Sequence, residues 1–322
     1  MNGTTIKEVP SSIVLKNLRK LNIRGWKGTL YSFYSKPARH VPMGLLLSCL
    51  SGLHSLTYMD LFDCNILSIP NDIGCLSSLV RLDLSGNNFV SLLERISQLS
   101  YLQTLYLEGC KRLQSLENVP STIDFVFANN CTSLERLSKL QNDPFGSYHW
   151  NFCFQCLNSF KSVDNVQSCN NMLQVSLSLS LSLSLSQVLN IMLCVFQKQS
   201  PKLPDMLEIL FLGSEIPKWF SQESLGDKLN VQVPSRGYNE LMGITFCVVF
   251  VPNECHQCPI YWDFSCSFKV DGSQFEETLV ESSISTKYGK VESHHCWLLY
   301  LSNHNEVTCC HSNWQKIFSP ID

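Results

Sequence analysis

The stretch Leu82-Asp83-Leu84-Ser85-Gly86-Asn87-Asn88-Phe89 decides the fold of this chain. Its two alternating leucines fit a short strand, because side chains along a strand point to opposite faces and every second one reaches the interior. The same alternation occurs 23 residues earlier, at Met59 and Leu61, and 23 residues later, at Leu105 and Leu107. A motif repeated at a fixed interval predicts a stack of similar coils.

The complete repeat follows the pattern L-x-x-L-x-L-x-x-N/C, which is typical of leucine-rich repeats with periods of about 20 to 29 residues. Because one coil cannot bury its own apolar face, about three or more must stack. We therefore expect an α/β leucine-rich-repeat solenoid over residues 1–140, with an insertion at about 29–52 where the pattern is interrupted. The five aligned copies are Leu18, Leu21, Ile23 and Trp26; Leu56, Met59, Leu61 and Cys64; Leu79, Leu82, Leu84 and Asn87; Leu102, Leu105, Leu107 and Cys110; and Ile123, Val126, Ala128 and Cys131.

The composition indicates a folded protein with room for about two domains, because 44% of the 322 residues are hydrophobic and 16% are charged. The net charge is −3, so charge gives no reason to expect a nucleic acid as partner. The first twelve residues are polar and run directly into the repeats, so we predict no signal peptide.

Sixteen cysteines raise the question of a metal site. Cys64, Cys110 and Cys131 occupy the repeat position that Asn87 occupies in its own copy, so a turn explains them without a metal. Two Cys-x-x-Cys pairs, Cys153 with Cys156 and Cys255 with Cys258, have the gap of a zinc knuckle, but they are far apart and form no regular set. We predict no metal, no other cofactor and reduced thiols.

Residues 175–186 consist of a valine followed by alternating serine and leucine, within an uncharged stretch. The stretch is long enough to span a membrane, but the serines make it weak for that purpose, and a low-complexity insertion or translated non-coding sequence is favoured. It marks a domain boundary, so residues 141–200 are interpreted as a linker.

Short apolar runs follow this linker at residues 229–233, 244–251, 264–270 and 297–301, separated by residues typical of turns. Strands at such spacing predict an all-β sandwich over residues 201–322, whose closing strands are in doubt because the sequence diverges after Leu301.

Within this region, Gly213-Ser214-Glu215-Ile216-Pro217-Lys218-Trp219-Phe220 resembles a signature of plant disease-resistance receptors. Residues 243–250 and 294–301 resemble two further strands of the same domain, and residues 152–157 resemble the motif that links it to the repeats. These receptors combine a Toll/interleukin-receptor-like domain, a nucleotide-binding domain, leucine-rich repeats and a C-terminal jelly-roll/Ig-like domain called C-JID. The resemblance implies a C-terminal fragment of such a receptor.

The resemblance implies a cytoplasmic, or else nuclear, recognition region whose partner is a pathogen effector or another receptor domain. No G-x-x-x-x-G-K-[ST] phosphate loop occurs, so we expect no nucleotide in this chain. The region is therefore expected to sense without signalling on its own.

The outward residues that flank the strand leucines are the candidates for partner binding, since Tyr, Phe and Arg are common among residues that dominate protein interfaces. They line the expected concave face: Arg24, Tyr58, Asp60, Phe62, Arg81, Asp83, Tyr106, Glu108, Phe125 and Phe127. The C-JID signature residues are Gly213, Ser214, Glu215, Ile216, Pro217, Trp219 and Phe220, where the proline is interpreted as fixing a buried turn.

The sequence raises two other interpretations. Catalysis is not expected, because His294, His295 and His311 cannot be paired with a nucleophile by any known spacing. A truncated or mis-joined gene product without independent function stays open as the alternative.

Overall fold

The computed structural model describes residues 17–25, 52–120, 122–137, 151–159, 206–212, 243–250, 261–268, 277–285 and 294–302. The chain divides into two compact units, residues 1–176 and 177–322, and each is described by itself. The insertion expected at about 29–52, the Ser-Leu tract and the signature Gly213–Phe220 lie outside the described residues, apart from Gly52.

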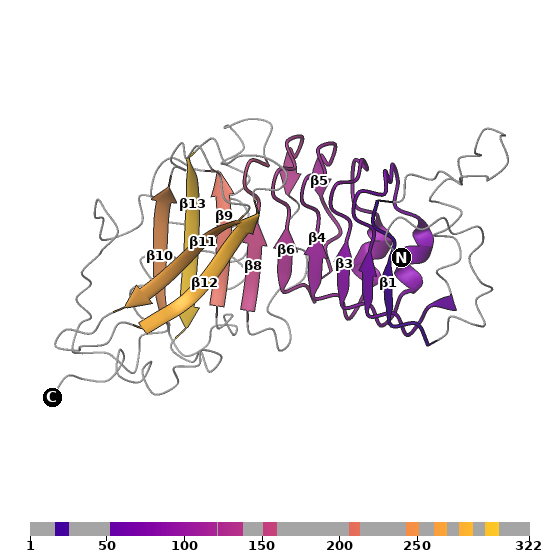
Figure 1. The fold of residues 1–322 in the computed structure, drawn as a ribbon, viewed down its shortest axis with the longest axis horizontal. Helices are drawn as coiled ribbons and strands as arrows, with labels where there is room; N and C mark the ends of the chain where they lie inside the picture. Colours follow the sequence, from indigo (N-terminus) through magenta and orange to yellow (C-terminus); the bar gives the residue numbers. More distant parts are fainter. Residues whose placement is uncertain are drawn as a thin grey trace, which may run out of the picture. The chain divides into compact units, whose positions relative to one another are not determined.

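The first unit is built on a sheet of short parallel strands (Figure 1). Neighbouring strands pair in register, so that Leu21, Met59, Leu82, Leu105 and Val126 form one continuous row across the sheet. The strands follow the order β1 (Lys20–Asn22), β2 (Tyr58–Asp60), β3 (Arg81–Asp83), β4 (Thr104–Tyr106), β6 (Phe125–Phe127) and β8 (Asn151–Gln155). The predicted leucine-rich-repeat fold is confirmed for this unit.

Each coil can be described by nine positions, counted from the first leucine of the repeat. Positions 4 and 6 point into the core, and their side chains in the second to fifth coils are at most 1% exposed. Burying one such leucine stabilises the fold by about 1.5 to 3 kcal/mol. Positions 3, 5 and 7 alternate with the core residues and point outward, and we call their combined surface the strand face.

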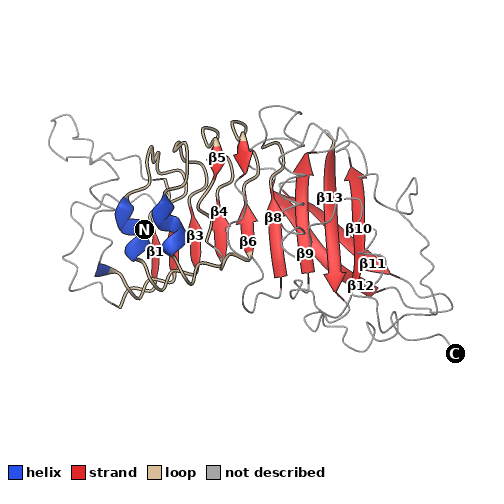
Figure 2. Cartoon of the chain, turned by 180° about the vertical axis from the view of Figure 1, so that it is seen from behind, coloured by secondary structure: helices blue, strands red, loops and turns tan. Residues whose placement is uncertain are grey.

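The return half of two coils forms short 3-10 helices, η2 (Asn71–Cys75) and η3 (Glu94–Gln98), each of which buries one isoleucine, Ile73 or Ile96. Two later coils instead pair through β5 (Ser115–Leu116) and β7 (Arg136–Leu137), which form a second, small parallel ladder. Figure 2 shows these helices and the strands as separate parts of the coils. The part of the chain that the structure describes contains no helix long and apolar enough to cross a membrane.

Position 8 of every coil has a left-handed backbone, with φ between 51° and 72°. Only glycine adopts this region freely, while asparagine and aspartate tolerate it better than other residues, and the sequence obeys that restriction in all six coils. The backbone N–H of position 8 also donates to the carbonyl of position 7 in the next coil, as from Gly86 to Glu108 at 2.8 Å. The position 8 residues are Gly25, Asp63, Gly86, Gly109, Asn130 and Asn158.

Strand β8 comes from the segment that the sequence assigned to the linker. It pairs in parallel with β6, matching Phe154 to Val126 and Gln155 to Phe127, so the stack of coils continues past residue 140. The sequence pattern did not reveal this coil because Phe154 and Cys156 replace the usual leucines, although both are buried.

The second unit contains a three-stranded antiparallel sheet in the order β9 (Met206–Leu212), β13 (His295–Ser302) and β10 (Gly243–Phe250). A separate antiparallel pair joins β11 (Tyr261–Phe268) to β12 (Glu277–Ser285). Strands β10, β11 and β13 overlap the apolar runs expected at 244–251, 264–270 and 297–301, whereas β9 and β12 were not predicted.

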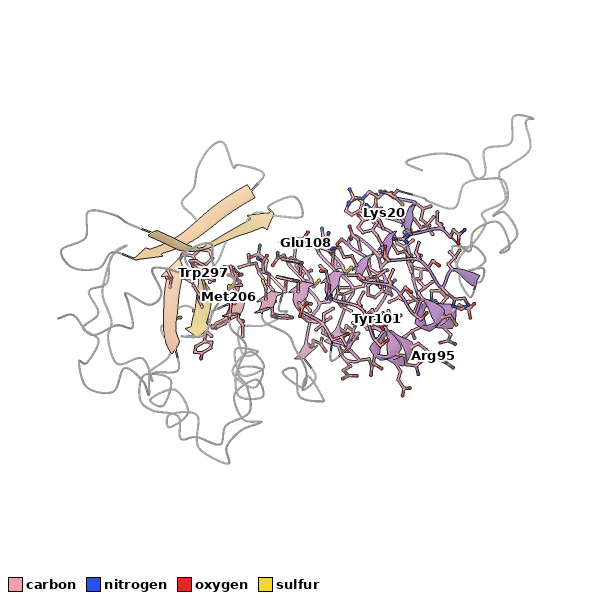
Figure 3. The ribbon with its side chains drawn as sticks, turned by 90° about the horizontal axis from the view of Figure 1, so that it is seen from below. Lys20, Arg95, Tyr101, Glu108, Met206 and Trp297 are labelled. Carbon is pink, nitrogen blue, oxygen red and sulfur yellow. The ribbon has the colours of Figure 1, made fainter. Side chains whose placement is uncertain are left out.

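Both faces of the central strand β13 are covered. Residues 295–300 are all at most 5% exposed, although successive side chains of a strand point to opposite faces. On one of these faces the indole N–H of Trp297 donates to Oε1 of Glu208 over 3.0 Å, so a carboxylate that is only 4% exposed has a partner. Figure 3 labels Trp297 and Met206 in this unit.

Candidate functional site

The coils are held in register by a ladder of side chains at position 9. In each case the side chain donates a hydrogen bond to the carbonyl of position 6 in the preceding coil, so the same contact is made by amide, thiol and hydroxyl groups. The donors are Cys64, Asn87, Cys110, Cys131 and Ser159, at donor–acceptor distances of 3.1, 2.8, 3.3, 3.1 and 2.5 Å. The ladder fixes the turns that follow the strand face.

Asn87 makes more of these contacts than any of the cysteines, because an amide can both donate and accept. Its Nδ2 donates to the carbonyls of Leu61 and Leu84 at 2.8 Å each. Its Oδ1 accepts the backbone N–H groups of Cys64 at 3.1 Å and Ile66 at 2.9 Å. The side chain is fully buried, and water does not compete for these bonds.

Two thiols of the ladder, Cys110 and Cys131, are packing groups rather than reactive ones. Burial raises the pKa of Cys110 to about 12 and that of Cys131 well above its ordinary value. A thiol held protonated is a poor nucleophile and a poor metal ligand. Among the described residues no group of three or more His, Cys, Asp or Glu side chains is placed to hold a metal ion.

An ionic cluster occupies the first three coils of the strand face. Arg24 donates from Nε to Asp60 at 2.6 Å and from Nη2 to Asp83 at 3.1 Å, and its guanidinium lies 5.0 Å from the centre of the Phe62 ring. Tyr58 donates to the same Asp60 oxygen at 3.2 Å. One arginine therefore bridges three coils.

The charges in this cluster shift the pKa of its members. Burial alone lowers the pKa of Arg24, but Asp60 and then Asp83 outweigh burial and raise it above the ordinary value. The pKa of Tyr58 is raised by burial and by Asp60, because both oppose formation of a phenolate.

An aromatic strip occupies the next two coils. The rings of Tyr106 and Phe127 stack with their centres 5.0 Å apart and an interplanar angle of 11°, and Phe125 stacks on Phe127 at 6.5 Å and 5°. All three side chains are half-buried. Stacking of neighbouring rings covers part of the apolar surface that separate rings would leave in water.

A polar chain borders this strip at position 7. Asn129 donates from Nδ2 to Glu108 at 3.1 Å and to Gln155 at 3.2 Å, and accepts the backbone N–H of Leu157. The pKa of Tyr106 is raised by burial and by Asp83 and Glu108, although Arg81 acts in the opposite direction. Polar and charged side chains of the strand face thus interact with one another from the third coil to the fifth.

The structure gathers the predicted strand-face residues on one surface, but it does not make them equally accessible. Arg81 is exposed, and Tyr58, Phe62 and Glu108 are half-buried. Asp60 and Asp83 are 1% and 8% exposed, because Arg24 and neighbouring backbone groups surround them. The sequence showed which residues face outward but not that these two carboxylates are enclosed.

Comparison with known proteins agrees with this architecture. The Leucine Rich Repeat family matches residues 55–76 and 78–99, and the C-JID domain family matches residues 211–317. The two matched families are the combination that the sequence resemblance implied.

Its sequence relatives are plant disease-resistance proteins. The disease resistance protein RPP2B of Arabidopsis thaliana is 29% identical over 256 residues, which cover 79% of this chain and 20% of that protein. The disease resistance-like protein DSC1 of the same plant is 25% identical over 237 residues, covering 73% and 18%. The chain thus spans about a fifth of the length of these relatives. A leucine-rich-repeat protein of Leptospira interrogans also aligns in structure, with a TM-score of 0.30, 21% identity and coverage of 50% of this chain and 42% of that one.

Proposed function

We propose that this chain is a non-catalytic recognition region of an intracellular plant immune receptor, and that the strand face of its repeats binds a pathogen effector or another receptor domain. Relatives named as disease resistance proteins support the immune role. The observation that carries the binding site is the aromatic strip of Tyr106, Phe125 and Phe127. Three stacked rings at outward positions form a rigid apolar surface of the kind that anchors protein partners.

We further propose that residues 201–322 form a β-sandwich of the C-JID type. The covered faces of β13 support a layered domain, because a lone sheet would leave one face in water. The chain is expected to reside in the cytoplasm or the nucleus, where a receptor of this class would meet an effector.

The proposal can be tested by co-expressing the full chain with a panel of pathogen effectors in leaf cells and measuring association by split luciferase. For an effector that associates, the double variant Tyr106→Ala with Phe127→Ala should lower the signal at least about tenfold, because hot-spot truncations cost about 2 kcal/mol or more. Tyr101→Ala is the matched control: Tyr101 is 66% exposed, and Figure 3 places it on the side of the coils opposite Lys20. Equal signals from both variants for every associating effector would refute binding through the strand face.

A further inference from the structure

In the first three coils, the accessible charge of the strand face is positive. Lys20 and Arg81 are exposed, and neither forms an ion pair within the described part of the chain. Arg24 is paired, but 42% of its side chain is exposed. These three residues, which we call the cationic corner, belong to the first and third coils of one continuous sheet.

The two carboxylates of these three coils, Asp60 and Asp83, are already occupied. Asp60 accepts hydrogen bonds from the backbone N–H of Phe62 and from the side chains of Asn22, Tyr58 and Arg24. Asp83 accepts the backbone N–H of Ser85 as well as Arg24. Both are buried, so a partner that approaches this end of the face meets cations first.

The cationic corner adjoins the aromatic strip. Arg81 pairs in register with Thr104, which in turn pairs with Phe125, so two strand spacings separate Arg81 from that ring. Neighbouring strands lie about 4.8 Å apart, which places the two positions about 10 Å from each other. An extended peptide covers that distance in about three residues.

We propose that the strand face selects a protein segment in which an acidic residue lies two to four residues from a large apolar or aromatic residue. The acid would pair with the cationic corner (Lys20, Arg24 and Arg81), and the apolar side chain would pack on the aromatic strip (Tyr106, Phe125 and Phe127). This inference rests on the proposed function and adds the chemistry of the partner to it. A protein segment fits better than a nucleic acid, because the rings are stacked on one another and a base needs an open ring face.

The test uses the full chain and a phage-displayed library of random twelve-residue peptides. Selection should enrich peptides with Asp or Glu two to four residues from Phe, Trp, Tyr or Leu. The most enriched peptide is then synthesised with a fluorophore, and its affinity is measured by anisotropy. Arg81→Glu should weaken binding at least tenfold and Arg81→Gln should weaken it less, since the first reverses the charge and the second removes it.

Arg95→Glu is the matched control. Arg95 is an exposed arginine of η3, and Figure 3 shows it on the opposite side of the coils from Lys20 and Glu108. This variant should bind within about twofold of the unmodified chain, because charges farther apart than about 10 Å are largely screened at physiological salt. Circular dichroism melts of all three variants should superimpose, which shows that the losses are not due to unfolding.

The outcomes separate this inference from the proposed function. Enrichment of basic or neutral peptides that lose affinity with Tyr106→Ala would overturn the acidic specificity and leave the strand face as a binding surface. Peptides indifferent to both Tyr106→Ala and Arg81→Glu would overturn both. A failure to enrich any peptide, or stronger Arg81-dependent binding of a labelled single-stranded oligonucleotide, would also overturn the inference.

Discussion

Replacing Asn87 by alanine should be among the most destabilising single changes in the repeats. The side chain is fully buried and bonds two backbone N–H groups and three backbone carbonyls. Alanine can make none of these bonds, and the affected groups belong to turns buried between the second and third coils. The substitution therefore leaves polar backbone atoms of two coils without a partner.

The size of the effect follows from the groups left behind. An unsatisfied buried donor or acceptor costs about 1 to 3 kcal/mol, and such costs are less than additive because the loop relaxes. The N–H groups of Cys64 and Ile66 and the carbonyl of Leu61 lose their Asn87 partner, whereas the carbonyl of Leu84 keeps the Cys110 thiol. We expect a loss of about 3 to 5 kcal/mol, a large fraction of the 5 to 15 kcal/mol typical of a folded domain.

The measurement is urea unfolding of the full chain, followed by far-ultraviolet circular dichroism, combined with hydrogen exchange of residues 61–66. Asn88→Ala is the matched control, because Asn88 is the next residue and its side-chain amide donates to the exposed side chain of Asn65, at 2.9 Å. That variant should lose less than about 0.5 kcal/mol. Asn87→Cys should fall between them, since a thiol can still donate to the preceding coil, as Cys110 does.

Unfolding of Asn87→Ala at the same urea concentration as Asn88→Ala would contradict this role of the Asn87 side chain. Unchanged protection of the amides of residues 61–66 in Asn87→Ala would also contradict it, because the lost acceptor serves two of those N–H groups.

Four further predictions concern other parts of the chain. Arg24→Met should destabilise the repeats by about 1 to 2 kcal/mol, measured by urea unfolding, because it leaves two buried carboxylates without their cation; no loss would show that the bridge contributes nothing. In native protein treated with iodoacetamide at pH 8, peptide mapping should find Cys75, which is exposed, alkylated long before Cys110, whose pKa is about 12. Folding raises the pKa of Cys110, so its contribution to the free energy of unfolding is complete below about pH 9. Between about pH 9 and pH 12 this contribution should fall by about 1.4 kcal/mol per pH unit, as measured by urea unfolding. The Cys110→Ser variant should lose less stability over the same pH range. Trp297→Phe should lower the free energy of unfolding of the second unit by about 1.5 to 3 kcal/mol, because it removes the hydrogen bond to buried Glu208. If an unpaired charge causes this loss, adding Glu208→Gln to the same variant should recover part of it.

The sequence predicted the coils well because their period is repeated and physically strict. The buried rows at positions 4 and 6 could be read from leucine spacing alone, and the strands lie where that spacing placed them. Position 8 carried an equally strong signal, since only Gly, Asp and Asn occupy it. That restriction was visible in the sequence, and it would also have indicated the sixth coil through Asn158.

Two features could not be predicted from spacing. Strand β8 lacks the leucines that define the other coils, and its register depends on pairing with β6 across a separation of 28 residues. The enclosure of Asp60 depends on Arg24, which lies 36 residues earlier and reaches it only because the coils stack. Contacts between outward side chains of different coils have no period, so a repeat pattern carries no information about them.

Position 5 separates outward residues that serve the fold from those that do not. In the first three coils it holds Asn22, Asp60 and Asp83, and each accepts the backbone N–H of the residue two positions later, at 3.2, 3.1 and 2.9 Å. In the fourth and fifth coils it holds Tyr106 and Phe127, whose rings cannot accept such a bond, and in the fourth coil that N–H turns to the hydroxyl of Ser85 instead.

The aromatic residues at position 5 therefore replace a side chain that would stabilise its own coil. These large apolar side chains give their coils no backbone hydrogen bond and stay half-buried. Selection for contact with another molecule explains such residues better than selection for folding. Asp60 and Asp83, in contrast, stabilise the coils, because each accepts a backbone N–H group and pairs with Arg24. Among the residues that the repeat pattern turns outward, the aromatic strip together with Lys20 and Arg81 thus consists of residues whose identity the coils themselves do not require.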